Sequence, residues 1–468
     1  MNLDPRIGAL FLSGSLVACS LAGCSGAEDP IEAPPATTTS PPETSTPPPE
    51  APPPETTAPA TTTDPGEGDP LADLAAPVHE DEVVDAHPSA IASPTLARGT
   101  CQEVAEAPVR VLPRASAFSI VAARDRFYLA AYEGLDAGAE QVSIVELVAG
   151  QAPRLVVSIP IASPAARRTV APAIALVGAA GSEASELGVS WIDGMGAVRA
   201  AFFDPARPVA RAIELGLVDA DLRFAPALAR IGAQRVVAAT IAIPENGPAD
   251  QPTRTAMRMH LVRVDAQGEV VGTHDVSPRA GMGSHPLFAP GPSGASELFF
   301  IDARVALSVI HRVGFDEDVM PGDAAVARPV NLSAEPPSFA IARVSGRELA
   351  IYAAVGNLAT RAVGVVELGG TDAPDGVVPG LGYGQPLTVR AISRTTDAVV
   401  ASEAPSAAPA DAPHEVRVRT IAVGESGARV LGEPLVLAGA TRPALAIDAS
   451  GVIAIALEGG LVRFVRCG

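Results

Sequence analysis

A pattern of short apolar strands recurs seven times between residue 117 and the C-terminal end of this chain of 468 residues. Each copy holds an apolar strand, a turn and a second apolar strand, as in PALARIGAQRVVAATIAI from Pro226. The spacing of 49 to 60 residues is typical of a four-stranded propeller blade rather than a helical repeat. The repeat therefore predicts an all-β fold, a seven-bladed β-propeller, with six or eight blades as the alternatives. The copies start near residues 117, 172, 226, 286, 337, 386 and 443.

A third strand with alternating polar and apolar residues follows in each copy, for example RMHLVRVD from Arg258. Fourth strands are recognisable in six copies, but the seventh copy ends after its third strand, LVRFVRC. One strand, APVRVLP at 107–113, precedes the first copy and belongs to none of them. If it pairs with the last third strand, the seventh blade is complete and its open edge is removed. We therefore predict that strand 107–113 closes the ring.

The N-terminal segment has the features of an export signal. Residues 7–18, IGALFLSGSLVA, are apolar but too short to span a bilayer. The following LAGC, which ends at Cys24, resembles the lipobox of bacterial lipoproteins. This resemblance implies that residues 1–23 are a signal peptide and that Cys24 carries the lipid. The alternatives are lipidation at Cys19, in the overlapping LVAC, and an ordinary secretory signal. By the same resemblance, Ser25 implies sorting to the outer membrane, on either its periplasmic or its surface face.

Residues 24–100 have the composition of a disordered linker. The segment is rich in Pro, Thr and acidic residues and contains almost no aromatic or periodic apolar residues, so it cannot build a core. Its proline density favours an extended polyproline conformation. It carries 14 acidic residues and one arginine, which is about two thirds of the net charge of −20. We therefore expect a tether, followed by one folded domain at 101–468.

Ring closure also predicts a disulfide. It brings the segment near Cys101 next to the last third strand, which contains Cys467. These are the only cysteines left after lipidation at Cys24, and an exported chain lies in an oxidising compartment. We predict a Cys101–Cys467 disulfide, with two free thiols as the alternative. Over residues 101–468 the pattern is similar to the seven-bladed β-propeller lipoproteins of bacterial envelopes, without the repeated signature of a named propeller family.

Composition and spacing exclude several functions. All 33 basic residues are arginine, so the chain lacks the lysine of P-loop, Schiff-base, kinase and S-x-x-K sites. The net charge of −20 and the scattered arginines argue against nucleic-acid binding. No histidine pair has metal-binding spacing, and no G-x-S-x-G motif occurs. We therefore predict no metal, no cofactor and no identifiable catalytic residue.

Four residues are candidates for ligand binding. In a propeller, the loops between second and third strands share one face with the connections between blades, and both kinds are elaborated here. His285 and Tyr383 lie in glycine-rich connections and either face the channel mouth or are exposed turn residues. Arg230 and Arg390 each lie four residues after the proline that opens a blade. They either point along the axis and bind an anion or form salt bridges between blades.

The sequence thus favours a binding function over catalysis. We expect a monomeric, lipid-anchored module of the cell envelope that presents its loops to a protein or an envelope polymer. The alternative is a propeller hydrolase or lyase that acts on an extracellular glycan or small ester at the channel mouth. A purely structural spacer would have uniform loops, and the unequal loop lengths count against it.

Overall fold

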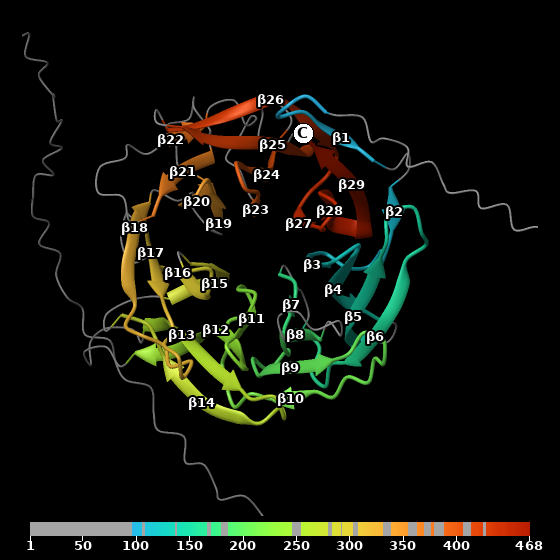
Figure 1. The fold of residues 1–468 in the computed structure, drawn as a ribbon. Helices are drawn as coiled ribbons and strands as arrows, with labels where there is room; N and C mark the ends of the chain where they lie inside the picture. Colours follow the sequence, from blue (N-terminus) through green and yellow to red (C-terminus); the bar gives the residue numbers. More distant parts are fainter. Residues whose placement is uncertain are drawn as a thin grey trace, which may run out of the picture. The chain divides into compact units, whose positions relative to one another are not determined.

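The computed structural model describes most of residues 96–468, so the predictions for the signal peptide, Cys19, Cys24 and the linker up to residue 95 lie outside it. The last residues assigned to the linker already belong to the folded domain, since Gly99 donates its backbone N–H to the Gly468 oxygen at 3.0 Å. The stretches within this range that are not described are 105–107, 136–137, 166–169, 179–185, 246–253, 279–282, 292, 303–307, 331–337, 354–362, 369–375, 379–387, 406–412 and 425–426. The described residues form seven antiparallel sheets arranged in a ring (Figure 1). The predicted all-β, seven-bladed propeller is therefore confirmed.

In the first six blades, four strands that follow one another in the chain pair in order, from the ring centre outward. Blade 1 comprises β3 (Phe118–Ala123), β4 (Arg126–Gly134), β5 (Glu140–Leu147) and β6 (Arg154–Pro160). Blade 2 comprises β7 (Ala173–Leu176), β8 (Leu187–Ile192), β9 (Val198–Phe203) and β10 (Ile213–Glu214). Blade 3 comprises β11 (Ala227–Ile231), β12 (Gln234–Glu245), β13 (Arg254–Val264) and β14 (Val270–Asp275). Blade 4 comprises β15 (Gly283–Pro290), β16 (Ser296–Asp302), β17 (Ser308–Val313) and β18 (Ala325–Val330). Blade 5 comprises β19 (Phe339–Val344), β20 (Arg347–Ala353), β21 (Val363–Glu367) and β22 (Gly376–Val378). Blade 6 comprises β23 (Thr388–Ser393), β24 (Asp397–Pro405), β25 (His414–Gly424) and β26 (Gly427–Ala438).

The hydrophobic core is divided among the junctions between neighbouring blades. Each of the seven junctions contains one cluster of buried side chains from the two blades that meet there. Second strands supply many fully buried alanines, such as Ala130, Ala239 and Ala401. Small side chains suit this position because the blades converge toward the axis and leave little room between them. This explains how a chain with only 4% aromatic residues forms a packed propeller.

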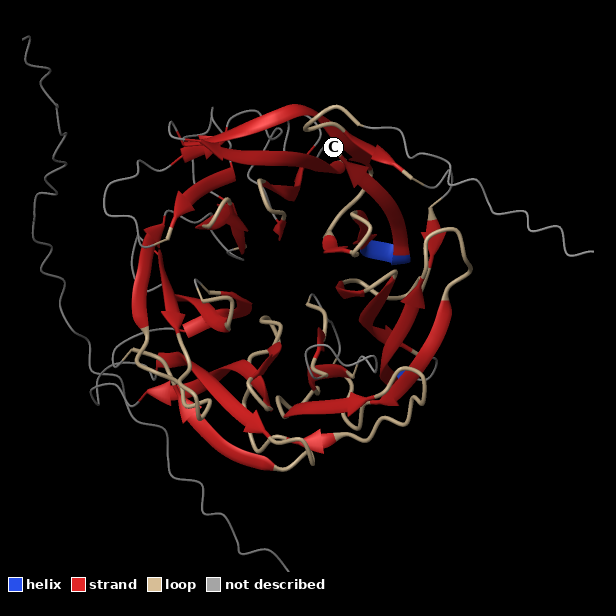
Figure 2. Ribbon diagram, in the orientation of Figure 1, coloured by secondary structure: helices blue, strands red, loops and turns tan. Residues whose placement is uncertain are grey.

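Blade 7 is completed by the N-terminal end of the domain. It contains β27 (Ala444–Ile447), β28 (Val452–Leu457) and β29 (Leu461–Cys467), with the short 3₁₀ turn η2 (Glu458–Gly460) before β29. Both β1 (Cys101–Glu103) and β2 (Val109–Arg110) pair antiparallel with the outer edge of β29. The prediction that strand 107–113 closes the ring is therefore confirmed through β2, and the closing segment extends further, back to Cys101. Within the described residues, no helix is long and apolar enough to cross a membrane, and strands dominate the ring (Figure 2).

The closing segment crosses blade 7 at a glycine. The Val111 N–H donates to the Gly460 carbonyl at 2.7 Å. Gly460 has φ of 76°, and a Cβ at this position would lie 1.6 Å from the Val111 carbonyl oxygen. Any other residue would both strain the backbone and push the closing segment away.

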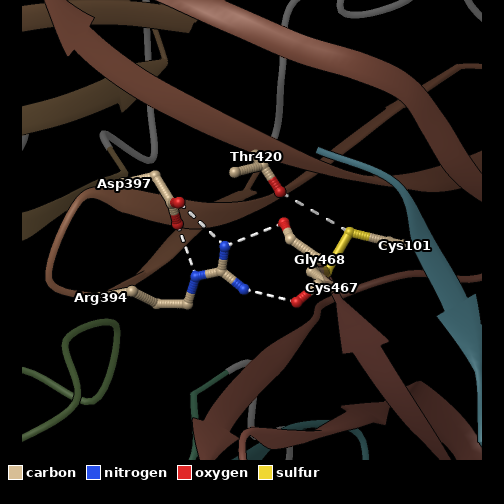
Figure 3. The surroundings of a disulfide bond; sticks show 6 residues. All are labelled: Cys101, Arg394, Asp397, Thr420, Cys467 and Gly468. Carbon is tan, nitrogen blue, oxygen red and sulfur yellow. Dashed lines mark hydrogen bonds and ion pairs between the residues drawn. A yellow bond between two sulfur atoms is a disulfide. The ribbon is translucent and has the colours of Figure 1, made fainter. Parts of the chain in front are cut away.

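A disulfide joins the two chain segments, as predicted. Cys101 and Cys467 are direct partners in the β1–β29 pair, and their sulfur atoms are bonded. Figure 3 shows that Arg394, in the β23–β24 turn of blade 6, reinforces this region. Its guanidinium donates to the Cys467 carbonyl at 2.6 Å and to the Gly468 backbone oxygen at 3.2 Å, while Asp397 holds it on the other side. Blade 6 thus anchors the last residues of the chain.

We predict that the Cys101→Ser, Cys467→Ser double variant is less stable than the wild type by about 4 to 5 kcal/mol, because the bridge closes a very long loop in the unfolded chain. Denaturant unfolding followed by circular dichroism measures this difference. Reduced wild-type protein serves as the control and should unfold like the double variant. Unchanged stability in both samples would contradict the prediction.

Candidate functional site at the ring centre

The first strand of every blade lines the ring centre, and these strands all run in the same direction (Figure 1). We call the face on which they begin the loop face, and the face that carries the turns between first and second strands the turn face. Residues at the beginnings of first strands therefore meet at the centre of the loop face. Polar and charged side chains from the connection into blade 3 and from blades 4 and 6 meet there.

His285 occupies an irregular position near the beginning of β15. Ser284 pairs with Ile301 and Leu287 with Phe299, so His285 and Pro286 form a bulge opposite one residue of β16. His285 has φ of 56°, which is an unusual backbone conformation for a residue other than glycine. Bulges and strained residues of this kind re-aim side chains and are frequent at functional sites.

The His285 side chain contacts blade 3 and is held neutral. Its ring lies edge-on against Phe224 with 4.5 Å between ring centroids, and Nδ1 lies 3.0 Å from the Ser284 hydroxyl. Burial and the positive charges of Arg390 and Arg223 lower the pKa of His285 to about 3, while Asp221 opposes the shift. Blades 4 and 6 are separated by blade 5, so the interaction with Arg390 spans the inner end of blade 5, where Arg390 also bonds to Ser338.

Arg390 provides a guanidinium group at the same place. This residue lies on β23, is exposed to solvent and donates through Nη1 to the Ser338 hydroxyl at 3.3 Å and to the Val389 carbonyl at 3.0 Å. The surrounding protein lowers the pKa of Arg390, and the charge of Glu403 opposes this effect. Since arginine stays protonated in proteins, Arg390 remains a cation. Its Nε and Nη2 groups have no partner among the described residues.

A second arginine stands beside His285 on the connection into blade 3. Asp221 accepts hydrogen bonds from the Arg223 guanidinium at 2.7 Å and from the Arg223 backbone N–H at 2.9 Å. Burial favours the neutral acid, but these hydrogen bonds outweigh it and hold the pKa of Asp221 below its ordinary value. The Arg223 guanidinium also lies over the Phe224 ring, 5.4 Å from its centroid. Arg223 is thereby fixed next to the histidine.

A buried carboxylate in blade 6 limits the positive charge. Glu403 accepts hydrogen bonds at 2.8 Å from the His414 ring and from the Arg442 backbone N–H, which belongs to the connection into blade 7. Its charge also acts on Arg390. The centre of the loop face therefore combines two arginines, a neutral imidazole and fixed carboxylates at its edge. Guanidinium groups in this setting bind carboxylate, sulfate or phosphate.

The structure brings two of the four predicted residues together. His285 and Arg390 lie close enough for their charges to interact. Arg230 lies next to the β11–β12 turn, toward the turn face, where its Nε donates to the Gly232 carbonyl at 2.8 Å. Tyr383 lies outside the described residues. No group of three metal-binding side chains occurs in the described part of the chain.

Sequence reasoning missed Arg223, Phe224 and Ser338. They lie in connections between blades, where no periodic pattern distinguishes one polar residue from another. The sequence DLRF, which begins at Asp221, carries a weak signal, because an aspartate favours a turn in which its side chain accepts the backbone N–H two residues later.

Comparison with family models finds no match, and comparison with curated proteins finds none either. Comparison with solved structures finds similarity at low sequence identity. The polysaccharide lyase Uly1 is 8% identical over 75% of this chain and 89% of its own, with a TM-score of 0.45. AofleA from Arthrobotrys oligospora is 10% identical over 73% of this chain and 92% of its own, with a TM-score of 0.41. The Aleuria aurantia lectin, described as a six-bladed β-propeller, is 10% identical over 71% of this chain and 98% of its own, with a TM-score of 0.40.

The lowered pKa of His285 leads us to predict that the stability of the fold depends on pH. The pKa of His285 falls from an ordinary 6.5 to about 3 on folding, so the unfolded chain binds more protons between these values. The free energy of unfolding should be highest above pH 6.5 and fall as the pH decreases toward 3. In the His285→Gln variant, the slope between pH 4 and 6 should be smaller by up to about 1.4 kcal/mol per pH unit.

Urea unfolding at several pH values measures this slope. Burial also lowers the pKa of His260 and of His274, so part of the slope should remain in the variant. Equal slopes for the wild type and the His285→Gln variant would show that His285 ionises normally in the folded protein.

Proposed function

We propose that this chain is a lipid-anchored binding module of the bacterial cell envelope and that the centre of its loop face binds an anionic group. The group belongs to a protein or an envelope polymer. In this proposal Cys24 carries the lipid, residues 24–100 form the tether, and the propeller is the binding domain.

The observation that carries the proposal is the meeting of His285 and Arg390 at the centre of the loop face. Arg390 has N–H groups without partners in the described part of the chain, and His285 is kept neutral by burial together with two nearby guanidinium groups. A bound anion would accept hydrogen bonds from the arginine and offset the contribution of its positive charge to the low pKa of the imidazole. The strained bulge at His285 also supports a functional role, since such strain is usually retained where function requires it.

The second candidate function is a propeller lyase or hydrolase at the same place. A neutral imidazole beside a guanidinium group is a suitable pair for removing a proton next to a carboxylate. However, a base with a pKa of about 3 is weak at neutral pH, so the substrate would first have to raise it. Binding without chemistry requires no such change and is the better supported function.

Binding to dextran sulfate, with uncharged dextran as the matched polymer, tests the anion site. The wild type should retain dextran sulfate, and binding should weaken as salt is added. The Arg390→Ala variant should bind roughly tenfold more weakly, the usual effect of losing one charged hydrogen-bonding partner. Arg230→Ala is the matched control, because Arg230 also lies on a first strand but bonds to the Gly232 carbonyl near the turn face. Equal losses in both variants would contradict the proposal.

Membrane fractionation tests the anchor. Wild-type protein expressed in a Gram-negative cell should sediment with the outer membrane and incorporate a labelled fatty acid. The Cys24→Ala variant should lose the label and become soluble, whereas Cys19→Ala should behave like the wild type. A label that persists in Cys24→Ala and disappears in Cys19→Ala would move the lipidation site to Cys19.

A further inference from the structure

A cleft on the turn face between blades 1 and 2 has the features of a separate binding site. Its volume is about 560 Å³, within the range of pockets that hold small molecules. The β3–β4 turn and Arg154 of β6 form the wall from blade 1, and Asp204 to Ala206, after β9, form the wall from blade 2. The cleft therefore lies on the face opposite to His285 and Arg390.

A buried carboxylate forms the floor of the cleft. The Glu146 side chain is 8% exposed and accepts hydrogen bonds from Arg126 at 2.9 Å, from Tyr128 at 3.3 Å and from Arg154. Burial alone would raise the pKa of Glu146, but the two guanidinium groups outweigh it and lower the pKa. Glu146 therefore stays ionised and holds two arginines side by side.

The unused hydrogen-bonding groups of these arginines are all donors. Arg154 bonds to Glu146 through Nε, and its two Nη groups have no partner among the described residues. Arg126 uses Nε for Asp125 and Nη1 for Glu146, and its Nη2 is unpaired within the same part of the chain. The side chain of Arg126 is 42% exposed and that of Arg154 is 54% exposed, so solvent and ligands reach both. Both oxygens of Glu146 are occupied, which makes the floor a poor site for a cation.

Acceptors lie at the edge of the cleft. The Asp125 side chain is 71% exposed and the Asp204 side chain 30% exposed. Asp204 accepts the backbone N–H of Ala206 at 2.8 Å, which fixes its orientation toward the connection after β9. Carboxylates at the rim are suited to accept hydrogen bonds from hydroxyl groups, while the two central guanidinium groups are suited to a planar anion.

We propose that this cleft binds a small hydroxylated carboxylate, of the size and chemistry of a hexuronic acid unit. The carboxylate group contacts the outer N–H groups of Arg126 and Arg154, and the hydroxyl groups contact Asp125 and Asp204. Glu146 is a positioning residue, because it orients both arginines without reaching the ligand.

Isothermal titration calorimetry of the purified full chain with glucuronate tests the proposal, with glucose as the uncharged analogue. Glucuronate should bind, and glucose should bind roughly tenfold more weakly or not at all. Arg154→Ala should weaken glucuronate binding roughly tenfold or more. Arg154→Lys keeps the charge but not the planar group and should show an intermediate loss.

Arg211→Ala is the matched control, because it removes an exposed arginine of blade 2 that does not line the cleft. It should leave the affinity for glucuronate unchanged. The loop-face proposal is tested by the effect of Arg390→Ala on dextran sulfate binding, so its failure and failure of the cleft proposal are distinguishable. Absence of glucuronate binding, or binding that Arg154→Ala leaves unchanged, overturns the proposal. Inorganic phosphate that binds as tightly as glucuronate overturns the assignment to a hydroxylated carboxylate.

Discussion

The outer edge of β29 is the strand edge on which the ring depends. In the first six blades, four consecutive strands pair with one another, so each sheet forms from one local segment. The seventh sheet takes β1 and β2 from the other end of the domain, and the cysteines joined there are 366 residues apart. Pairing at this edge converts a row of blades into a ring and covers an edge that would otherwise be open to association. The disulfide, the Arg394 contacts and the glycine crossing all reinforce it.

Closure of the ring also determines where side-chain chemistry can meet. All first strands run the same way, so residues at their beginnings approach one another only when the blades are held at fixed angles around the axis. His285 and Arg390 belong to blades 4 and 6 and interact without being neighbours in the sheet or the chain. A site of this kind draws on the rigidity of the whole ring. That rigidity also allows His285 to keep a backbone conformation that a loose loop would relax.

The blades could be predicted from the sequence because their strand pattern repeats, whereas the contacts at the candidate site occur once and could not be predicted. Alternating strands predicted the blades, and the predicted starts lie within three residues of the observed first strands. The closing segment was recognised only in part, because CQE at Cys101 is too short and polar to show a strand pattern. Arg230 and Arg390 share the same offset from a proline, yet β11 turns one residue after Arg230 and β23 continues for three residues after Arg390. The bulge that places His285 depends on pairing with β16, which no local pattern reveals.

Net charge is a poor guide to what such a domain binds. The chain carries −20 overall, but about two thirds of this charge belongs to residues 25–100. Charges further apart than about 8 to 10 Å are largely screened at physiological ionic strength. What a ligand meets at close range is the orientation of individual arginines: Ser338 and the Val389 carbonyl hold one side of Arg390, and Glu146 holds one side of Arg154. In both cases the remaining N–H groups form a planar donor set, which matches a carboxylate better than a spherical anion. An acidic chain can therefore bind anions on either face, because local orientation of the donors outweighs the total charge.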